Sequence, residues 1–305
     1  MTELVLSNHP VPLGKSGMNV SPLSWGMWRF RGADVDAARR RVEAALDAGM
    51  TLLDTADIYG PDNDERFGAA EALLGKVLKE APGLRSRMTL ATKGGIVMGV
   101  PYDSSPAYLA KAVEASLTRM GVDHIDLYQI HRPDHLAHPA DVAETLTRLK
   151  EAGKIGAVGT SNHTVAQTLA LQAYLPFPIA SIQIELSPLA IAPLYDGTVD
   201  HALETGLAVL AWSPLAQGRL GDGAESSDPK TIAVRAALET LAKREGVPLS
   251  AVAYAWLMAH PARPIPIIGT QTEARIAEAN RALEVRLTRA DWYAVLTAAR
   301  GERLP

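Results

Sequence analysis

Residues 51–54 read TLLD, a short apolar run that ends on a polar residue. The same pattern recurs three times, as MTLATK at residues 88–93, IDLYQIH at residues 125–131 and IGAVGTSN at residues 155–162. Helix-like segments separate these runs, and strands that alternate with helices are typical of a parallel sheet. In a closed parallel barrel all strand carboxyl ends open on one face, so the residues that end these runs are predicted to be neighbours.

The alternation continues over nearly the whole chain and predicts one (β/α)8 TIM barrel, in the α/β class, spanning residues 1–305 with an extra C-terminal helix. Beside the four runs, strands are expected at residues 22–26, 180–185, 207–212 and 264–268, the last interrupted by proline. Helices are expected at residues 34–49, 65–79, 105–121, 139–152, 165–174, 229–244, 248–259, 272–283 and 289–299. Asp34 and Ser105 are predicted N-caps.

The composition is that of a soluble globular protein, for which we expect a cytoplasmic location. Hydrophobic residues make up 47% of the 305 residues, and the formal charge of −4 argues against nucleic acid or an anionic membrane surface as a partner. The chain contains no cysteine, which excludes thiol catalysis, disulfides and thiolate metal sites. The N-terminal residues lack the pattern of a signal peptide, and no apolar run approaches the roughly 18 residues of a membrane span.

Four polar residues near the ends of strands two to four form a candidate catalytic set: Asp54, Tyr59, Lys93 and His131. A free phenol, with a pKa of about 10, donates a proton poorly at neutral pH, and a lysine ammonium beside Tyr59 would lower that pKa. Asp54 would hold Lys93 charged and oriented, and His131 would donate a hydrogen bond to a carbonyl oxygen. This combination suits proton donation to an oxygen that gains negative charge when hydride reaches its carbon.

Each of the four residues also has a purely structural interpretation. Asp54 could be a helix cap, Tyr59 a packed aromatic, Lys93 a solvated turn residue and His131 a loop histidine with satisfied hydrogen bonds. Their conjunction at three successive strand ends is what favours the catalytic interpretation.

Seven stretches of the chain, in this order, resemble the aldo-keto reductase superfamily: LDTADIYG, ATKGG, QIHRPD, GKIGAVGTSN, IQIELSPL, AWSPLAQGRL and PIPIIGTQTEARIAEA. The resemblance extends from about residue 13 to residue 300. It implies a barrel that binds NADP(H) without a Rossmann domain and reduces aldehydes or ketones. It also implies that Tyr59 is the proton donor, that Lys93 and Asp54 tune it, and that His131 orients the carbonyl.

The resemblance also assigns residues to the cofactor. Ser161, Asn162 and Gln183 match residues that bind the nicotinamide carboxamide, and Trp212 matches the aromatic on which the ring stacks, although a core tryptophan is the alternative. The matches for the loop near the nicotinamide are Gly26, Met27 and Trp28, and Asp54 also belongs to the cofactor set. The matches for the pyrophosphate segment are Ser213, Leu215, Gly218 and Leu220. The matches for the adenosine end are Ile268, Gly269, Thr270, Gln271, Arg275 and Glu278.

The chain departs from the family pattern at Gly269, where many members place a lysine that holds the 2′-phosphate. Arg275 remains and can pair with a phosphate in a bidentate way, so a preference for NADPH over NADH is expected. Thr270 is also expected to cap the last barrel helix, which would turn a backbone amide toward a phosphate.

The substrate pocket is expected to be lined by Trp28, Phe30, His131, Arg132, His135 and His163. The chain ends soon after its last helix, so we expect a rather open pocket. The long Gly- and Ser-rich stretch at residues 218–228 is either functional or a mobile surface insertion. The expected partner is a small carbonyl substrate, and the expected assembly a monomer or small homo-oligomer.

Two alternatives to a reductase are compatible with such a barrel. The first alternative is an NADPH-bound regulatory or scaffold subunit with little turnover, and the second a barrel lyase or isomerase without a nicotinamide. Pro133 interrupts any helix that would align His131, His135 and His138, so no metal site is expected. The glycines at 218, 221 and 223 do not open a βαβ unit, and Ser161 has no G-x-S-x-G elbow, which argues against a Rossmann fingerprint and a hydrolase triad.

Overall fold

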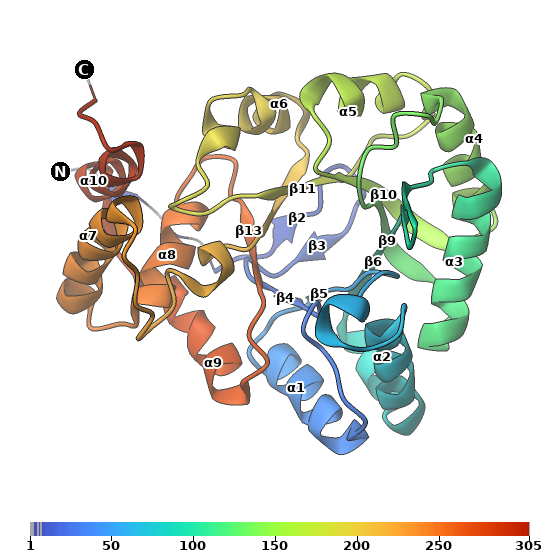
Figure 1. Cartoon of the computed structure of the whole chain (residues 1–305), viewed down its shortest axis with the longest axis horizontal. Coiled ribbons are helices and arrows are strands. Elements are labelled where there is room, and N and C mark those ends of the chain that lie inside the picture. Colours follow the sequence, from blue (N-terminus) through green and yellow to red (C-terminus); the bar gives the residue numbers. More distant parts are fainter. Residues whose placement is uncertain (1–2, 5, 7, 305) are drawn as a thin grey trace.

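The computed structural model describes residues 3–4, 6 and 8–304 of the chain. Its centre is a closed barrel of eight parallel strands (Figure 1). In order around the barrel the strands are β4 (Ser24–Gly26), β5 (Leu52–Asp54), β6 (Thr89–Gly94), β9 (Ile125–Ile130), β10 (Ile155–Ser161), β11 (Ser181–Glu185), β12 (Ala208–Trp212) and β13 (Ile265–Ile268). The predicted barrel is therefore confirmed, and the proline-containing last strand belongs to it.

Helices surround the barrel (Figure 1). They are α1 (Val35–Asp47), α2 (Ala69–Glu80), α3 (Pro106–Met120), α4 (Pro139–Glu151), α5 (Val165–Gln172), α6 (Thr198–Thr205), α7 (Pro229–Glu245), α8 (Leu249–Met258), α9 (Glu273–Glu278) and the extra C-terminal helix α10 (Arg289–Arg300). Asp34 and Ser105 cap α1 and α3 as predicted, since each side chain accepts a backbone N–H of the first turn. No helix in the described part of the chain is both long and apolar enough to cross a membrane.

Three helix predictions were incomplete or wrong. Helix α2 begins at Ala69 rather than near residue 65, because Pro61–Asn63 forms a 3₁₀ turn and Gly68 takes a left-handed conformation with φ of 78°. The short α6 was not predicted; it lies between two left-handed glycines, Gly197 and Gly206. The helix expected at 272–283 is α9 followed by a 3₁₀ turn over Ala279–Glu284.

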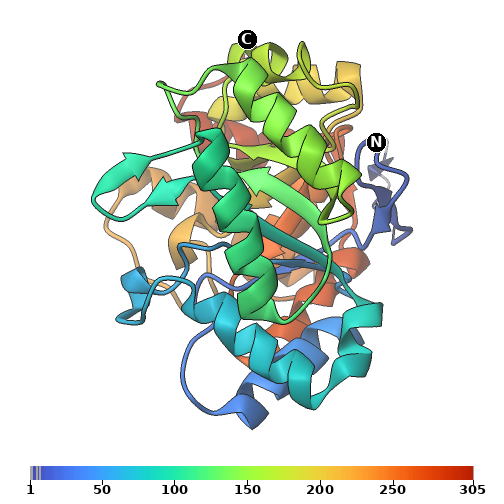
Figure 2. The ribbon, with the colours of Figure 1, turned by 90° about the vertical axis from the view of Figure 1, so that its right-hand side faces the viewer.

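Within the described residues, three small antiparallel pairs lie outside the barrel sheet, and the sequence did not predict them. They are β2 (Val11–Pro12) with β3 (Asn19–Val20), β1 (Glu3–Leu4) with β14 (Leu287–Thr288), and β7 (Ile96–Val97) with β8 (Val100–Tyr102). Figure 2 shows the β7–β8 hairpin projecting on the side opposite the N-terminal hairpin. Because β7 follows directly after β6, this hairpin stands at the carboxyl ends of the strands.

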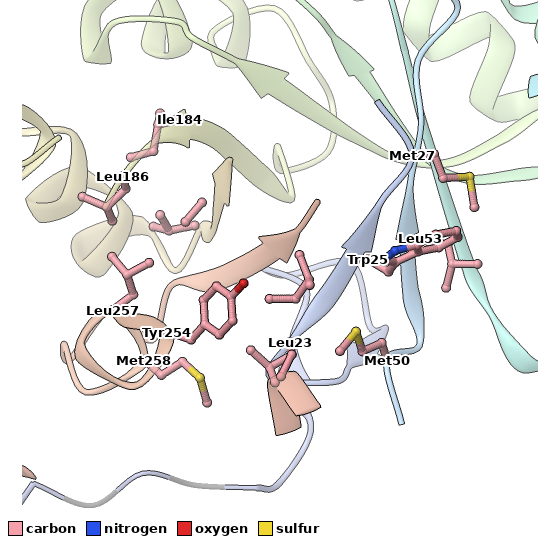
Figure 3. Close-up of a cluster of buried hydrophobic side chains, with 14 of the residues drawn as sticks. Leu23, Trp25, Met27, Met50, Leu53, Ile184, Leu186, Tyr254, Leu257 and Met258 are labelled. Atoms are coloured by element: carbon pink, nitrogen blue, oxygen red, sulfur yellow. The ribbon is translucent and has the colours of Figure 1, made fainter. Parts of the chain in front are cut away.

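Successive side chains along the strands point to opposite faces of the barrel sheet, so the buried apolar residues form two clusters, one on each face. The inner cluster fills the barrel and includes Leu52, Ala91, Leu127 and Leu210, together with residues of the N-terminal hairpin. The outer cluster lies between the strands and the helices. Figure 3 shows a part of it, with Leu257 and other side chains of α8 near β11. The strands are therefore covered on both faces, as in other parallel barrels.

Helices α8 and α10 are joined by a reciprocal pair of tryptophans. The indole nitrogens of Trp256 and Trp292 each donate to the other residue's carbonyl oxygen at 3.0 Å. Their rings are stacked, with centroids 4.8 Å apart and planes 8° from parallel. This pair fixes the extra helix against the barrel helices.

We expect Trp256→Phe to lower the free energy of unfolding by about 2–3 kcal/mol, about 1 from the lost hydrogen bond and the rest from the smaller buried ring. Urea unfolding followed by circular dichroism measures this change. Trp28→Phe, at a half-exposed position, is the control and should stay within about 0.5 kcal/mol of the parent. Equal losses in the two variants would contradict the role given to the tryptophan pair.

Candidate active site

The barrel interior changes from apolar to polar toward the carboxyl ends of its strands. On β5 the inward positions are Leu52 and then Asp54, and on β6 they are Ala91 and then Lys93. Since every second strand residue points inward, the polar residue two positions after a core residue faces the same interior. The structure therefore brings Asp54 and Lys93 together, as the spacing predicted.

The Lys93 ammonium group is completely buried and uses all three of its N–H donors. Its Nζ donates to Asp54 Oδ2 at 2.7 Å, to the carbonyl oxygen of Thr55 at 2.8 Å and to Tyr59 Oη at 3.1 Å. Because the Tyr59 oxygen accepts the hydrogen bond from Lys93, the phenol proton stays available for another acceptor.

Two amide side chains orient the Asp54 carboxylate. Gln183 Nε2 donates to Asp54 Oδ1 at 3.0 Å, and Gln129 Nε2 donates to the same oxygen at 3.2 Å. Sequence reasoning missed Gln129. It stands two residues before His131 in the run IDLYQIH, and that spacing places both side chains inward and could have identified it.

Burial and charge oppose each other in the pKa values of this group. Burial acts to lower the pKa of Lys93, but the Asp54 carboxylate and Tyr59 raise it by more than burial lowers it. The net pKa lies above the ordinary value, so the ammonium stays charged. Burial raises the pKa of Tyr59, and the positive charge of Lys93 opposes this effect without cancelling it. The expected net lowering of the Tyr59 pKa is therefore wrong, because desolvation of the phenolate outweighs the ammonium. The phenol is protonated at neutral pH.

His131 lies beside Tyr59 at the end of β9, with ring centroids 5.9 Å apart and planes at 77°. Burial lowers the pKa of His131 well below its ordinary value, and the charges of Lys93 and Arg132 lower it further. The ring is therefore neutral and carries one N–H that can donate to a carbonyl oxygen. Its Nδ1 is buried without a hydrogen-bond partner in the described part of the chain.

Next to the catalytic candidates, β10 and β12 present amide, hydroxyl and aromatic groups. Trp212 Nε1 donates to Asn162 Oδ1 at 3.0 Å, and Asn162 Nδ2 donates to Ser161 Oγ at 2.7 Å. Asn162 holds a left-handed backbone, with φ of 57°. The Arg132 guanidinium lies 5.8 Å from the centroid of the Trp212 ring, so one face of that ring is already covered.

The expected pyrophosphate segment is a tight irregular turn after β12. Ser213, Ala216 and Gln217 have φ values of 50°, 49° and 60°, and Gly218 follows with 95°. Left-handed backbone conformations at non-glycine residues cost conformational free energy, and the surrounding structure must offset that cost. Leu215 is half-buried, and Gly218 is exposed.

Several residues expected to touch cofactor or substrate have buried side chains. Met27, Leu220 and Ile268 belong to the outer core cluster, so contacts with a ligand would come from their backbone. Phe30 is 2% exposed and packs edge-on against Trp25, with ring centroids 5.5 Å apart. Phe30 is therefore a core residue, and its expected place in the substrate pocket is wrong.

The remaining predicted residues lie at or near the carboxyl ends of the strands. Trp28 is half-exposed and donates to Asp62, and His163 Nδ1 contacts the Ser161 carbonyl oxygen at 3.0 Å. Gly269, Arg275 and Glu278 are exposed, and Gln271 Nε2 donates to the Gly26 carbonyl oxygen at 3.2 Å. Thr270 does not cap α9, because the N-cap residue is Thr272.

His135 and His163 line a cavity of about 210 Å³ outside the barrel wall, between β9, α4 and α5. In the described ranges no group of three or more metal-binding side chains lies together.

Comparison with known proteins identifies the relatives of this chain. The model of the Aldo/keto reductase family matches residues 22–299. The 6-dehydroglucose reductase of Novosphingobium aromaticivorans is 52% identical and aligns over 98% of this chain and 100% of its own length. The 6-dehydroglucose reductase of Agrobacterium fabrum is 37% identical over 94% and 97%, and oxidoreductase YdhF of Escherichia coli is 34% identical over 97% and 99%.

Among solved structures, a thermostable aldo-keto reductase in complex with the inhibitor epalrestat superimposes with a TM-score of 0.82. The alignment covers 95% of this chain and 99% of that chain at 22% sequence identity. At this identity the likeness concerns the fold.

Asp54→Asn would leave the Lys93 ammonium buried without an anion. We expect it to lower the free energy of unfolding by about 3–5 kcal/mol, as is common when one partner of a buried ion pair is removed. The matched control is Asp47→Asn, which breaks an exposed ion pair with Arg87 and should cost about 1 kcal/mol or less. Chemical denaturation measures both, and a loss below 1 kcal/mol for Asp54→Asn would contradict the buried-pair assignment.

Proposed function

This chain belongs to the aldo/keto reductase family, and from that premise we propose that it reduces an aldehyde or ketone to an alcohol with NADPH. The observation that carries this proposal is the buried Lys93 ammonium, which contacts Asp54, Thr55 and the Tyr59 phenol at once. In the proposed reaction Tyr59 protonates the carbonyl oxygen and His131 orients it through its N–H. Lys93 and Asp54 hold the phenol in place.

The residues at the mouth fit a nicotinamide. Ser161, Asn162 and the amide oxygen of Gln183 are suited to its carboxamide, and the face of Trp212 not covered by Arg132 is suited to its ring. At the adenosine end, Gln271 Oε1 is buried without a partner in the described ranges. When bound, the reduced nicotinamide supplies the hydride.

The electrostatics of Tyr59 favour reduction at neutral pH. A proton donor must carry its proton when the substrate oxygen gains negative charge. Burial keeps the phenol protonated, and the Lys93 ammonium stabilises the phenolate that remains after the transfer. The same ammonium therefore lowers the barrier to proton release without removing the proton beforehand.

The names of two relatives suggest a substrate class. Both are 6-dehydroglucose reductases, and one is 52% identical to this chain. We therefore place a sugar aldehyde of this kind first among candidate substrates. The exposed indole of Trp28 and the guanidinium of Arg132 would contact the sugar hydroxyls.

Tyr59→Phe should lower kcat by about 10²–10⁴-fold, the range typical of a lost general acid. The loss of absorbance at 340 nm with 6-dehydroglucose and simple aldehydes gives kcat. Quenching of tryptophan fluorescence by NADPH gives binding, which we expect to change less than about threefold, since the phenol is not a cofactor contact. A variant with parental kcat would refute the role of Tyr59, and a parent that binds NADPH but reduces no carbonyl would support the regulatory alternative.

Arg275→Ala should weaken NADPH binding by about tenfold or more and leave NADH binding nearly unchanged, because only NADPH carries the 2′-phosphate. Fluorescence titration with both cofactors measures the effect. Arg286→Ala removes another exposed arginine, whose side chain pairs with Glu3, and serves as the control. Equal losses for NADPH and NADH would contradict this assignment.

A further inference from the structure

A second set of buried polar side chains lies on the opposite face of β6 from Lys93. Thr92 points outward toward α2 and donates to Glu71 Oε1 at 2.5 Å. The guanidinium of Arg119 on α3 donates to the other oxygen of Glu71 at 2.7 Å. The charge of Glu71 is therefore neutralised by Arg119.

Asp57 lies beside this ion pair and is completely buried. Within the described ranges its Oδ1 has no hydrogen-bond partner, and its Oδ2 lies 3.4 Å from Tyr108 Oη. The hydroxyl of Tyr128, which is buried and likewise has no partner among the described residues, approaches the same glycine, Gly94. A Cβ at Gly94 would lie 3.2 Å from Asp57 Oδ2 and 2.1 Å from Tyr128 Oη, so glycine at this position allows both oxygens to approach.

The surroundings of Asp57 favour its neutral form. Burial, with a further contribution from Glu71, raises its pKa to about 8, while Arg119 opposes the change. The titratable groups that face Asp57 are Glu71 of α2, Arg119 and Tyr108 of α3, and Tyr128 of β9. Because Arg119 is bonded to Glu71, the carboxyl group of Asp57 has no cation of its own and carries a proton at neutral pH.

The proton on Asp57 determines which groups donate in a short chain of hydrogen bonds from Asp57 through Tyr108 to Ile96. Tyr108 Oη lies 3.4 Å from Asp57 Oδ2 and 3.4 Å from the carbonyl oxygen of Ile96 in β7. The hydroxyl has one proton for these two acceptors: it can donate to Asp57 Oδ2, and a proton carried by Asp57 allows it to donate to the Ile96 carbonyl instead. If Asp57 is ionised, Tyr108 must donate to the carboxylate, and the carbonyl of Ile96 loses this partner.

Asp57 stands two residues before Tyr59, in the turn that presents the phenol. Its backbone N–H donates to the Lys93 carbonyl oxygen at 3.0 Å, and the Tyr59 N–H donates to Ala56 at 3.2 Å. We propose that Asp57 is a positioning residue, whose neutral carboxyl group and relay through Tyr108 to Ile96 hold this turn and thereby keep Tyr59 against Lys93. This inference rests on the proposed function, because it takes Tyr59 as the proton donor.

The first test compares Asp57→Asn, Asp57→Ala and Tyr108→Phe by the pH dependence of kcat between pH 6 and pH 10. The parent kcat should fall about fivefold from pH 7 to pH 9, as a group with a pKa of about 8 loses its proton and the ionised form keeps about a tenth of the activity. Asp57→Asn still donates a hydrogen bond and cannot ionise, so it should keep kcat within about twofold at pH 7 and lose this fall. Asp57→Ala and Tyr108→Phe should lower kcat at pH 7 by about tenfold, with the KM for NADPH unchanged.

The control is Tyr102→Phe on β8 of the same hairpin, which should match the parent. Parental kcat and pH profile in Asp57→Ala, or the same alkaline fall in Asp57→Asn as in the parent, would overturn the proposal. A decrease in kcat that begins only above pH 9 would overturn the proposal too, because deprotonation of Tyr59, whose pKa is raised, would then explain the decrease.

The second test does not require turnover. In protein labelled with ¹³C at the tyrosine ζ carbon, the Tyr59 signal is assigned by its absence in Tyr59→Phe. This signal should shift as the pH passes through 8 in the parent and stay constant in Asp57→Asn. Constancy in both proteins would overturn the proposal. A parent that reduces no carbonyl compound would refute the proposed function, while this titration would still decide whether Asp57 positions Tyr59.

Discussion

An ammonium group without exposed surface lies inside the barrel, and each of its three N–H groups needs an acceptor there. Asp54, the Thr55 carbonyl and the Tyr59 phenol supply these acceptors. The carboxylate of Asp54 in turn takes amide donors from β9 and β11. One desolvated charge therefore fixes the relative positions of four strands at the carboxyl end of the barrel, because loss of any partner would leave a polar group unpaired in a site closed to water.

The same desolvation sets the chemistry of the site. It keeps the Tyr59 phenol protonated and the His131 ring neutral, whereas the ion pair keeps Lys93 charged. Three titratable groups within one small volume are thus held in three defined protonation states at neutral pH. A site of this kind has a proton to give, a neutral N–H to orient an oxygen and a positive charge to stabilise the phenolate, which together suit the reduction of a carbonyl group.

The sequence predicted those parts that follow from strand spacing. Runs that end in polar residues located Asp54, Lys93 and His131, and the barrel follows from the alternation of strands with helices. The direction of the Tyr59 pKa change could not be predicted, since it depends on how completely the phenol is buried. Phe30 was misplaced because a hydrophobic residue in a loop near the mouth can turn either to the ligand or to the core, and only the packing against Trp25 decides. Isolated turns such as the β7–β8 hairpin have too few residues for a periodic signal.

Asp57 shows why a residue that lies behind the site is harder to predict from sequence than the residues that line it. In LDTADIYG it stands between Asp54 and Tyr59, in the turn after β5, but its side chain is buried beside Tyr108 and Glu71 and not beside Lys93. The groups beside its carboxyl, Tyr108 and Tyr128, belong to α3 and β9, so no pattern in the neighbouring sequence predicts them. Strand β6 separates the two groups by the thickness of one backbone, with Lys93 on the inner face and Thr92 on the outer. The backbone N–H of Asp57 donates to the carbonyl oxygen of Lys93, so the turn that carries Asp57 is bonded directly to the strand that carries the buried ammonium.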